Sequence, residues 1–125
     1  MYSIQVESRF SSSHYLNEYE GNCARLHGHN WRVVVDVRGD QLTSNGMLID
    51  FTVLKSALDA IAHDFDHMVL NEHEHFKTNG INPTAETLAR YFHERLASTV
   101  HPHRIHAVSV YETDDTVASY LPHER

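Results

Sequence analysis

The pattern that most constrains this chain is an alternation that places histidines on the apolar side of two predicted strands. Over residues 2–14, apolar residues fall at even positions and polar residues at odd positions, and His14 shares the even parity. The second predicted strand, 29–38, carries a tryptophan and valines with the parity of His27 and His29. Because a strand projects every second side chain to the same face, all three imidazoles should project from apolar faces.

Three imidazoles that converge from neighbouring strands are a ligand set typical of catalytic zinc. They occupy three corners of a tetrahedron and leave the fourth to water or substrate, whereas structural zinc has four protein ligands. Cys23 lies four residues before His27, so its thiol is expected beside the cation, as a reactive thiol, a fourth ligand or a packing residue. The sequence therefore predicts a Zn²⁺ ion held by His14, His27 and His29.

Length, charge and cysteine usage restrict the class of protein. The chain has 125 residues, which predicts one domain over 1–125. Its net charge of −7 argues against nucleic acid or an anionic membrane as the main partner, because both select clustered Lys and Arg. The single cysteine rules out an internal disulfide and favours a reducing cytoplasm. The sequence lacks a basic start followed by an apolar run and any stretch of about 18 apolar residues, so neither export nor membrane spanning is predicted.

Two amphipathic helices are predicted in the middle of the chain. Asp50 is a good N-cap for the first helix. Its apolar stripe comprises Phe51, Leu54, Leu58, Ile61 and Phe65. A loop over about 71–81 then leads to Asn82 as a cap and Pro83 at the first position of the second helix. The stripe of that helix comprises Leu88, Ala89, Phe92 and Leu96.

Two short strands, 104–112 and 117–121, are predicted around the polar turn 113–116. In the first of them one face is expected to carry Val108 and Val110, and the other Ile105, Ala107 and Tyr111. The order strand, strand, helix, helix, strand, strand predicts an α+β domain, with two helices on one face of a four-stranded antiparallel sheet. Such a sheet has two edges open to pairing, so association with neighbouring subunits is predicted.

Six short motifs spread along the chain carry a resemblance to a known family. They are Phe10 to His14, Cys23 to His29, Leu48-Ile49-Asp50-Phe51, Asp66-His67 with Leu70-Asn71, Asn82-Pro83-Thr84-Ala85-Glu86 and Tyr111-Glu112-Thr113. Over nearly its whole length the chain resembles the 6-pyruvoyltetrahydropterin synthase and 6-carboxytetrahydropterin synthase family. The resemblance implies the tunnelling fold, in which sheets from several subunits close into a barrel. It also implies a homo-oligomer, a hexamer or tetramer, with active sites at subunit interfaces.

The spacing of the cysteine separates two groups within this family. Three residues lie between Cys23 and the His-Gly-His motif, as in the bacterial carboxytetrahydropterin type of the queuosine pathway. The pyruvoyl enzymes of animal biopterin synthesis resemble a longer spacing. The resemblance therefore implies conversion of 7,8-dihydroneopterin triphosphate to 6-carboxytetrahydropterin, with release of acetaldehyde and triphosphate. The alternatives are the pyruvoyl enzyme and a non-catalytic member that binds pterin or metal.

Residue chemistry and resemblance together suggest how such a site works. A zinc ion can bind oxygens of the substrate side chain and stabilise the enolate-like charge formed when an adjacent C–H is deprotonated. Cys23, as a thiolate favoured by the cation, would take the proton. Asp66 and His67 resemble the family's proton relay. Glu112 resembles its pterin anchor, a carboxylate that accepts two parallel hydrogen bonds from the ring.

Each of these residues also has a simpler interpretation. Cys23 would close a structural zinc site if it were a fourth ligand. Asp66 and His67 would cap the first helix, because a cationic histidine interacts favourably with the negative helix end. Glu112 would be a solvated carboxylate at a strand end.

Other histidines and cations are given no role in the reaction. Six histidines are interpreted as surface residues, with an adventitious metal site considered for the first two: His73, His75, His101, His103, His106 and His123. A triphosphate should meet cations, and four are candidates although their spacing selects none: Arg9, Arg25, Lys55 and Arg104.

Overall fold

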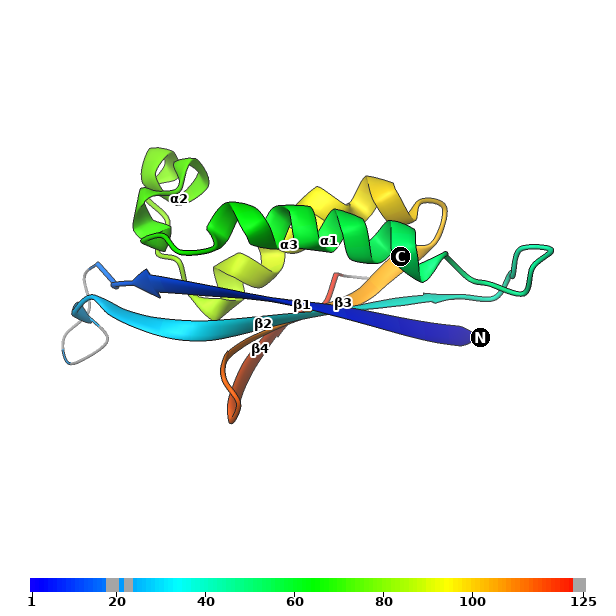
Figure 1. Ribbon diagram of the computed structural model, residues 1–125, viewed down its shortest axis with the longest axis horizontal. Coiled ribbons are helices and arrows are strands. Elements are labelled where there is room, and N and C mark those ends of the chain that lie inside the picture. The colour runs from blue at the N-terminus through cyan, green and yellow to red at the C-terminus, as the bar shows by residue number, and fades with distance from the viewer. Residues whose placement is uncertain (18–20, 22–23, 123–125) are drawn as a thin grey trace.

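Four antiparallel strands form one sheet in the order β1-β2-β3-β4 (Figure 1). The computed structural model describes residues 1–17, 21 and 24–122. The strands are β1 (Tyr2–His14), β2 (His27–Gly39), β3 (Arg104–Thr113) and β4 (Thr116–Tyr120). The predicted α+β fold and its element order are confirmed, with the first two strands long enough to carry the candidate ligands at one end of the sheet.

Two long helices lie on the same face of the sheet, α1 (Phe51–Phe65) and α3 (Ala85–Val100) (Figure 1). Asp50 caps α1 as predicted, since its carboxylate accepts a hydrogen bond from the Thr52 backbone N–H. The predicted stripes are buried against the sheet except at Phe51, which is 57% exposed. Phe51 is the first residue of the helix, so it lies beyond the end of the packed stripe.

The predicted loop over 71–81 instead contains two short helices, η2 (Leu70–Glu72) and α2 (Glu74–Asn79). The side chain of His73 caps α2 by accepting from the His75 backbone N–H. Gly80 ends α2 with a left-handed φ of 63°. A helix of six residues is too short to show an apolar period, so its caps were the only signals available in the sequence.

The second long helix begins later than predicted, and this difference shapes the site. Thr84, rather than Asn82, is the N-cap of α3, in a capping box with Thr87. Asn82 instead bonds the backbone of Asn17 in both directions. Pro83 therefore precedes the helix, and its carbonyl is left to accept a hydrogen bond from outside α3.

The core lies between the sheet and the two long helices. Its aromatic centre is Phe10, which packs against Trp31, Phe65 and Phe92 with ring centroids 5.6 to 6.1 Å apart. Ile105 was expected to face away from this core but is only 5% exposed. A β-bulge shifts the β2–β3 register between Asp36 and Val37, which reverses the facing of the residues before it in β3.

Register places the candidate ligands together. His14, the last residue of β1, lies directly opposite His27, the first residue of β2. Both share the face of Trp31, which is completely buried beneath the helices. Among the described residues, no helix is long and apolar enough to cross a membrane.

Candidate metal centre

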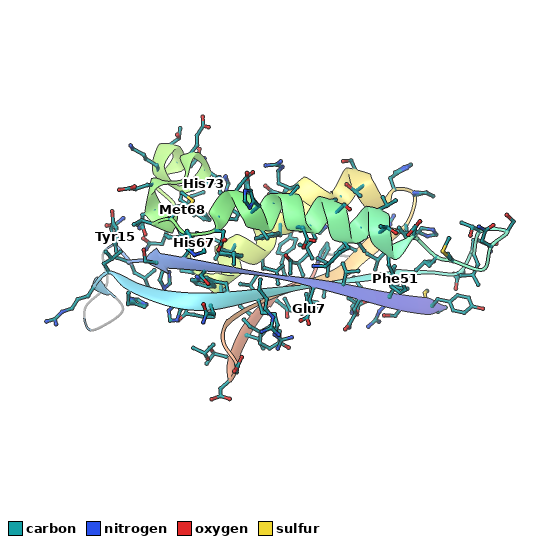
Figure 2. All side chains as sticks on the ribbon, in the orientation of Figure 1. Glu7, Tyr15, Phe51, His67, Met68 and His73 are labelled. Atoms are coloured by element: carbon teal, nitrogen blue, oxygen red, sulfur yellow. The ribbon has the colours of Figure 1, made fainter. Side chains whose placement is uncertain are left out.

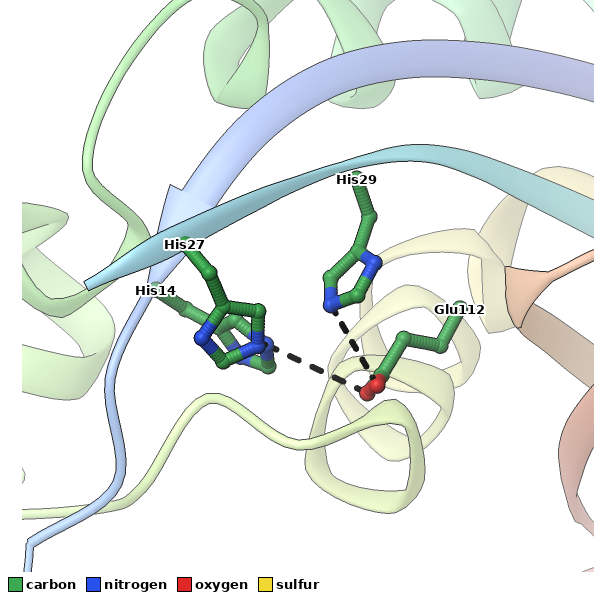
Figure 3. A group of neighbouring side chains, drawn as sticks. All are labelled: His14, His27, His29 and Glu112. Carbon is green, nitrogen blue, oxygen red and sulfur yellow. Dashed lines mark hydrogen bonds and ion pairs between the residues drawn. The ribbon is translucent and has the colours of Figure 1, made fainter. Parts of the chain in front are cut away.

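Four side chains from three strands converge at one end of the sheet. They are His14 of β1, His27 and His29 of β2, and Glu112 of β3, as Figure 3 shows. One ligand atom from each of the four lies within 4.8 Å of the others. In the part of the chain that the structure describes, this is the only such group of three or more histidine, cysteine or acidic side chains.

Backbone carbonyls fix the orientation of two of the imidazoles. His14 Nδ1 lies 2.7 Å from the Pro83 carbonyl oxygen, and His27 Nδ1 lies 2.6 Å from that of Arg25. A carbonyl oxygen only accepts, so each Nδ1 carries the proton, and Nε2 of the neutral ring is a lone-pair donor. The two Nε2 atoms are 3.0 Å apart. Metal-binding histidines are oriented in this manner by a second hydrogen bond.

The third imidazole also presents a nitrogen to the centre of the group. Nε2 of His29 is buried and has no hydrogen-bond partner among the described residues. Burial lowers the pKa of His29 and of His14, which is 2% exposed, because desolvation disfavours the charged imidazolium. Metal ligation requires neutral imidazole. The donor set therefore fits a divalent metal ion, and its nitrogen-rich composition suits zinc.

Glu112 completes the group from β3. Its Oε1 lies 3.3 Å from Nε2 of His29, and its Oε2 lies 4.0 Å from Nε2 of His14. The sequence marked Glu112 as a pterin anchor but did not place it beside the imidazoles. Strand parity gave part of the signal, since Glu112 is two residues beyond Val110 and shares its side of β3. The pairing of Val110 with Val33 of β2, which aligns that side with the imidazoles, is a structural finding.

The Asp66-His67 pair lies elsewhere, at the end of α1 and along the outer edge of β1. Ser11 holds it at two points, because its N–H donates to Asp66 Oδ1 over 2.8 Å and its carbonyl accepts from the His67 N–H over 2.6 Å. Asp66 Oδ2 pairs with His67 Nδ1 at 2.8 Å. The Ser11 hydrogen bond, then His67, lowers the pKa of the Asp66 carboxyl.

His67, labelled in Figure 2 near the end of β1, is unusual in its backbone and its exposure. Its φ of 56° lies in the left-handed region, which is uncommon for a residue other than glycine. Its side chain is 82% exposed. The pair is not part of the four-residue group, so the structure brings Asp66 and His67 together with each other but not with the metal ligands.

The remaining predicted residues are placed as follows. Cys23 lies outside the described residues. Of the six histidines predicted to lie on the surface, His101 is exposed and His123 lies outside the described residues. The other four are half-buried: His73, which packs on Phe65, and His75, which packs on Tyr91, each with centroids 4.4 Å apart, and also His103 and His106.

One of the four candidate cations for triphosphate is already engaged within the chain. Lys55 Nζ donates to the backbone carbonyl of Glu7 over 2.8 Å and pairs with Asp59 at 2.6 Å. It lies on α1, away from the four-residue group.

The family model described as 6-pyruvoyl tetrahydropterin synthase matches residues 3–123. The chain belongs to this family. A Synechocystis protein named 6-carboxy-5,6,7,8-tetrahydropterin synthase is 36% identical, with 97% of this chain and 94% of the relative covered. The human 6-pyruvoyl tetrahydrobiopterin synthase is 31% identical, with 94% and 83% covered.

Solved structures of the family agree with the fold. The Caenorhabditis elegans 6-pyruvoyl tetrahydropterin synthase superposes with a TM-score of 0.85 at 27% identity, covering 98% of this chain and 96% of that one. The chain is thus a member of a family of tetrahydropterin synthases, with the family's fold and a possible metal-binding group at the end of its sheet.

Proposed function

We propose that this chain is a zinc-dependent 6-carboxytetrahydropterin synthase. It would convert 7,8-dihydroneopterin triphosphate to 6-carboxy-5,6,7,8-tetrahydropterin and release acetaldehyde and triphosphate, as a step of queuosine biosynthesis in the cytoplasm. Relatives from Synechocystis and Bacillus subtilis that are 36% and 32% identical bear the name of this enzyme, which supports the proposal. The spacing of Cys23 before the His-Gly-His motif supports the same choice.

The observation that carries the proposal is the set of three converging imidazoles, two of which have tautomers fixed by hydrogen bonds. His14 and His27 each give their Nδ1 proton to a backbone carbonyl, and His29 presents a buried nitrogen without a hydrogen-bond partner among the described residues. When bound there, zinc would supply a Lewis acid for oxygens of the substrate side chain. The three residues hold their donor atoms in place before binding, so little reorganisation is needed.

The Asp66-His67 pair is proposed to hold and return a proton. Asp66 fixes the ring through Nδ1, which leaves Nε2 of the exposed His67 to exchange a proton with substrate. Because His67 points from the outer edge of β1, its position supports a reaction centre completed by another subunit. We therefore include in the proposal a homo-oligomer, a hexamer or tetramer, with active sites at subunit interfaces.

Cys23 and Glu112 complete the assignment. Cys23 would be the base that removes a proton from the substrate side chain, since a thiolate beside a cation is the reactive form of cysteine. Glu112 would hold the pterin ring, because a carboxylate can accept parallel hydrogen bonds from an amino group and an adjacent N–H. Glu112 is one-third exposed, so a ligand can reach it.

A product assay tests the function. Purified, zinc-loaded protein is incubated with 7,8-dihydroneopterin triphosphate, and the pterin products are separated and identified by mass. We expect 6-carboxytetrahydropterin together with acetaldehyde. The human relative at 31% identity supports a second candidate, the pyruvoyl enzyme, which the pyruvoyl compound as sole product would establish.

A third candidate is a non-catalytic pterin- or metal-binding member of the fold. It predicts that zinc-loaded protein binds its ligand but yields no product. Replacing Cys23 with Ala separates this candidate from an enzyme. The enzyme would keep its metal and lose turnover, whereas the binding protein has no turnover to lose.

A further inference from the structure

Glu112 lies closer to the imidazoles than a residue that only anchors the pterin ring needs to lie. Its two carboxylate oxygens are 3.3 Å from Nε2 of His29 and 4.0 Å from Nε2 of His14 (Figure 3). It has no ion pair with Lys or Arg among the described residues. The imidazole group is therefore the electrostatic environment of this carboxylate.

The imidazoles offer this carboxylate few hydrogen-bond donors. The Nδ1 protons of His14 and His27 go to backbone carbonyls, so in the neutral rings Nε2 carries a lone pair, and Nε2 of His14 lies 4.0 Å from a Glu112 oxygen. The contact between His29 and Glu112 has the length of an ion pair, yet Nε2 of His29 makes no hydrogen bond with it. A carboxylate and several lone-pair nitrogens repel one another unless a cation lies among them. The arrangement thus suits a metal with one oxygen and three nitrogen ligands.

The backbone at Glu112 forms a β-bulge at the end of β3. Tyr111 pairs with Val117 of β4, and Thr113 pairs with Thr116, so the register shifts at Glu112 and leaves it without a partner there. The pairing of β3 with β2 reaches only as far as Tyr111. A bulge at a sheet end commonly directs a side chain into a site without fixing it in a ladder.

We propose that Glu112 is the fourth metal ligand in the substrate-free protein and leaves the metal when it binds the pterin ring. This inference rests on the metal site of the proposed function. Two parallel hydrogen bonds from the ring engage both carboxylate oxygens and draw the carboxylate toward the ring, so ring binding would compete with metal binding and open the fourth coordination position. The metal would then meet exogenous ligands only when substrate is present.

The test uses the full-length protein loaded with Co²⁺, whose visible absorption reports its ligands, and titrates it with imidazole. The titration is run at about pH 8.5, well above the pKa of imidazole, so that imidazole is neutral and its attraction to or repulsion by the carboxylate does not enter. We expect imidazole to bind wild-type protein at least about tenfold more weakly than the Glu112→Gln variant, because the open form would be about a tenth of the population or less. The control Glu94→Gln removes the same charge from an exposed pair with Arg90 and should behave as wild type.

Adding unsubstituted pterin sharpens the test, because it has the ring but no side chain to bind the metal. Saturating pterin should strengthen imidazole binding to wild-type protein toward that of Glu112→Gln and leave the variant unchanged. Equal imidazole affinities of wild type and Glu112→Gln would overturn the inference while the proposed function stands. Failure of wild-type protein to take up Co²⁺ or Zn²⁺ at all would overturn both.

Discussion

The two histidine groups of this chain differ in how completely one chain builds them. The imidazoles of His14, His27 and His29 are buried or half-buried, and two are fixed by backbone carbonyls from outside their own strands. His67 is 82% exposed on the outer edge of β1, and its only ion-pair partner among the described residues is the neighbouring Asp66. The first group has its candidate ligand atoms already together, whereas the second has a fixed orientation and, among the described residues, no ionic partner beyond Asp66.

This difference indicates which part of the proposed reaction one chain can provide alone and which part needs a second subunit. A metal site binds best when its ligands already lie within a few ångströms of one another, and here one chain brings four candidate ligands together. A proton relay needs only a correctly oriented imidazole that reaches the substrate from another side. The left-handed backbone of His67 is held in place, since Ser11 donates its N–H to the Asp66 carboxylate and accepts from the His67 N–H.

The largest effect is expected from removing a metal ligand. His29→Ala should abolish stoichiometric zinc and lower turnover by about 10³-fold or more, because the Lewis acid is lost. Metal content and the product assay measure both effects. The matched control is His101→Ala, an exposed histidine that should retain zinc and activity. Full zinc retention by His29→Ala would show that His14, His27 and His29 do not form the metal site.

A somewhat smaller effect is expected at the exposed group. His67→Ala should lower turnover by about 10²-fold, as loss of a proton-transfer residue commonly does, with zinc content unchanged. His63→Ala, an exposed histidine in the last turn of α1, is the control. Metal content separates the two groups, because only the buried one should affect it.

Mixing inactive variants tests whether the two groups work across a subunit boundary. Oligomers assembled from His29→Ala and His67→Ala subunits should regain activity, because some sites would combine an intact ligand set with an intact His67. No regain in oligomers shown to be mixed would place both groups in a site within one chain.

The facing of the three histidine ligands could be predicted from the sequence, because the alternation of side chains along a strand is a local property. The alternation that ends at His14 and begins at His27 placed the ligands on the covered face, and register then made them opposite neighbours. The position of Glu112 was missed because it depends on how β3 aligns with β2, which is a long-range pairing.

The departures in the fold have similar causes. Ile105 changes face through a bulge, which no local pattern marked. The α3 cap moved from Asn82 to Thr84 because Asn82 bonds Asn17, a partner distant in sequence. His67 could be named from its motif, but its exposure depends on the packing of the chain between α1 and η2 along β1.

A modest effect on stability and zinc affinity is expected from the N-cap of α3, Thr84, which follows the residue whose carbonyl holds His14. Thr84→Ala removes the capping box and should lower the free energy of unfolding by about 1 kcal/mol. It should also weaken zinc binding by up to about tenfold, because the Pro83 carbonyl beside the cap orients the ligand. Denaturant unfolding and zinc competition measure these effects. Ser98→Ala, at an exposed position of α3, is the control, and equal zinc affinities would separate the cap from the ligand.

The smallest effect is a pH dependence confined to the segment that follows His67. Burial lowers the pKa of His73, which packs on Phe65 and caps α2. Because the unfolded state binds this proton more readily, the stabilisation is fully present above the ordinary pKa that histidine has in the unfolded chain. It is lost as the pH falls through the lower pKa of the folded state. His73→Asn keeps a capping acceptor but cannot titrate, so its stability should fall less on acidification than that of wild type.

Hydrogen exchange locates that loss. Relative to the intrinsic exchange rate at each pH, acidification should speed exchange over 70–79 more in wild-type protein than in His73→Asn. Exchange over 31–37, beneath the helices, should be the same in both proteins. Since the two differ only at His73, the other histidines contribute equally and cancel. Equal acceleration over both segments would mean that protonation acts on the whole fold. The segment after His67 would then not respond to pH separately from the part of the sheet that carries His14, His27 and His29.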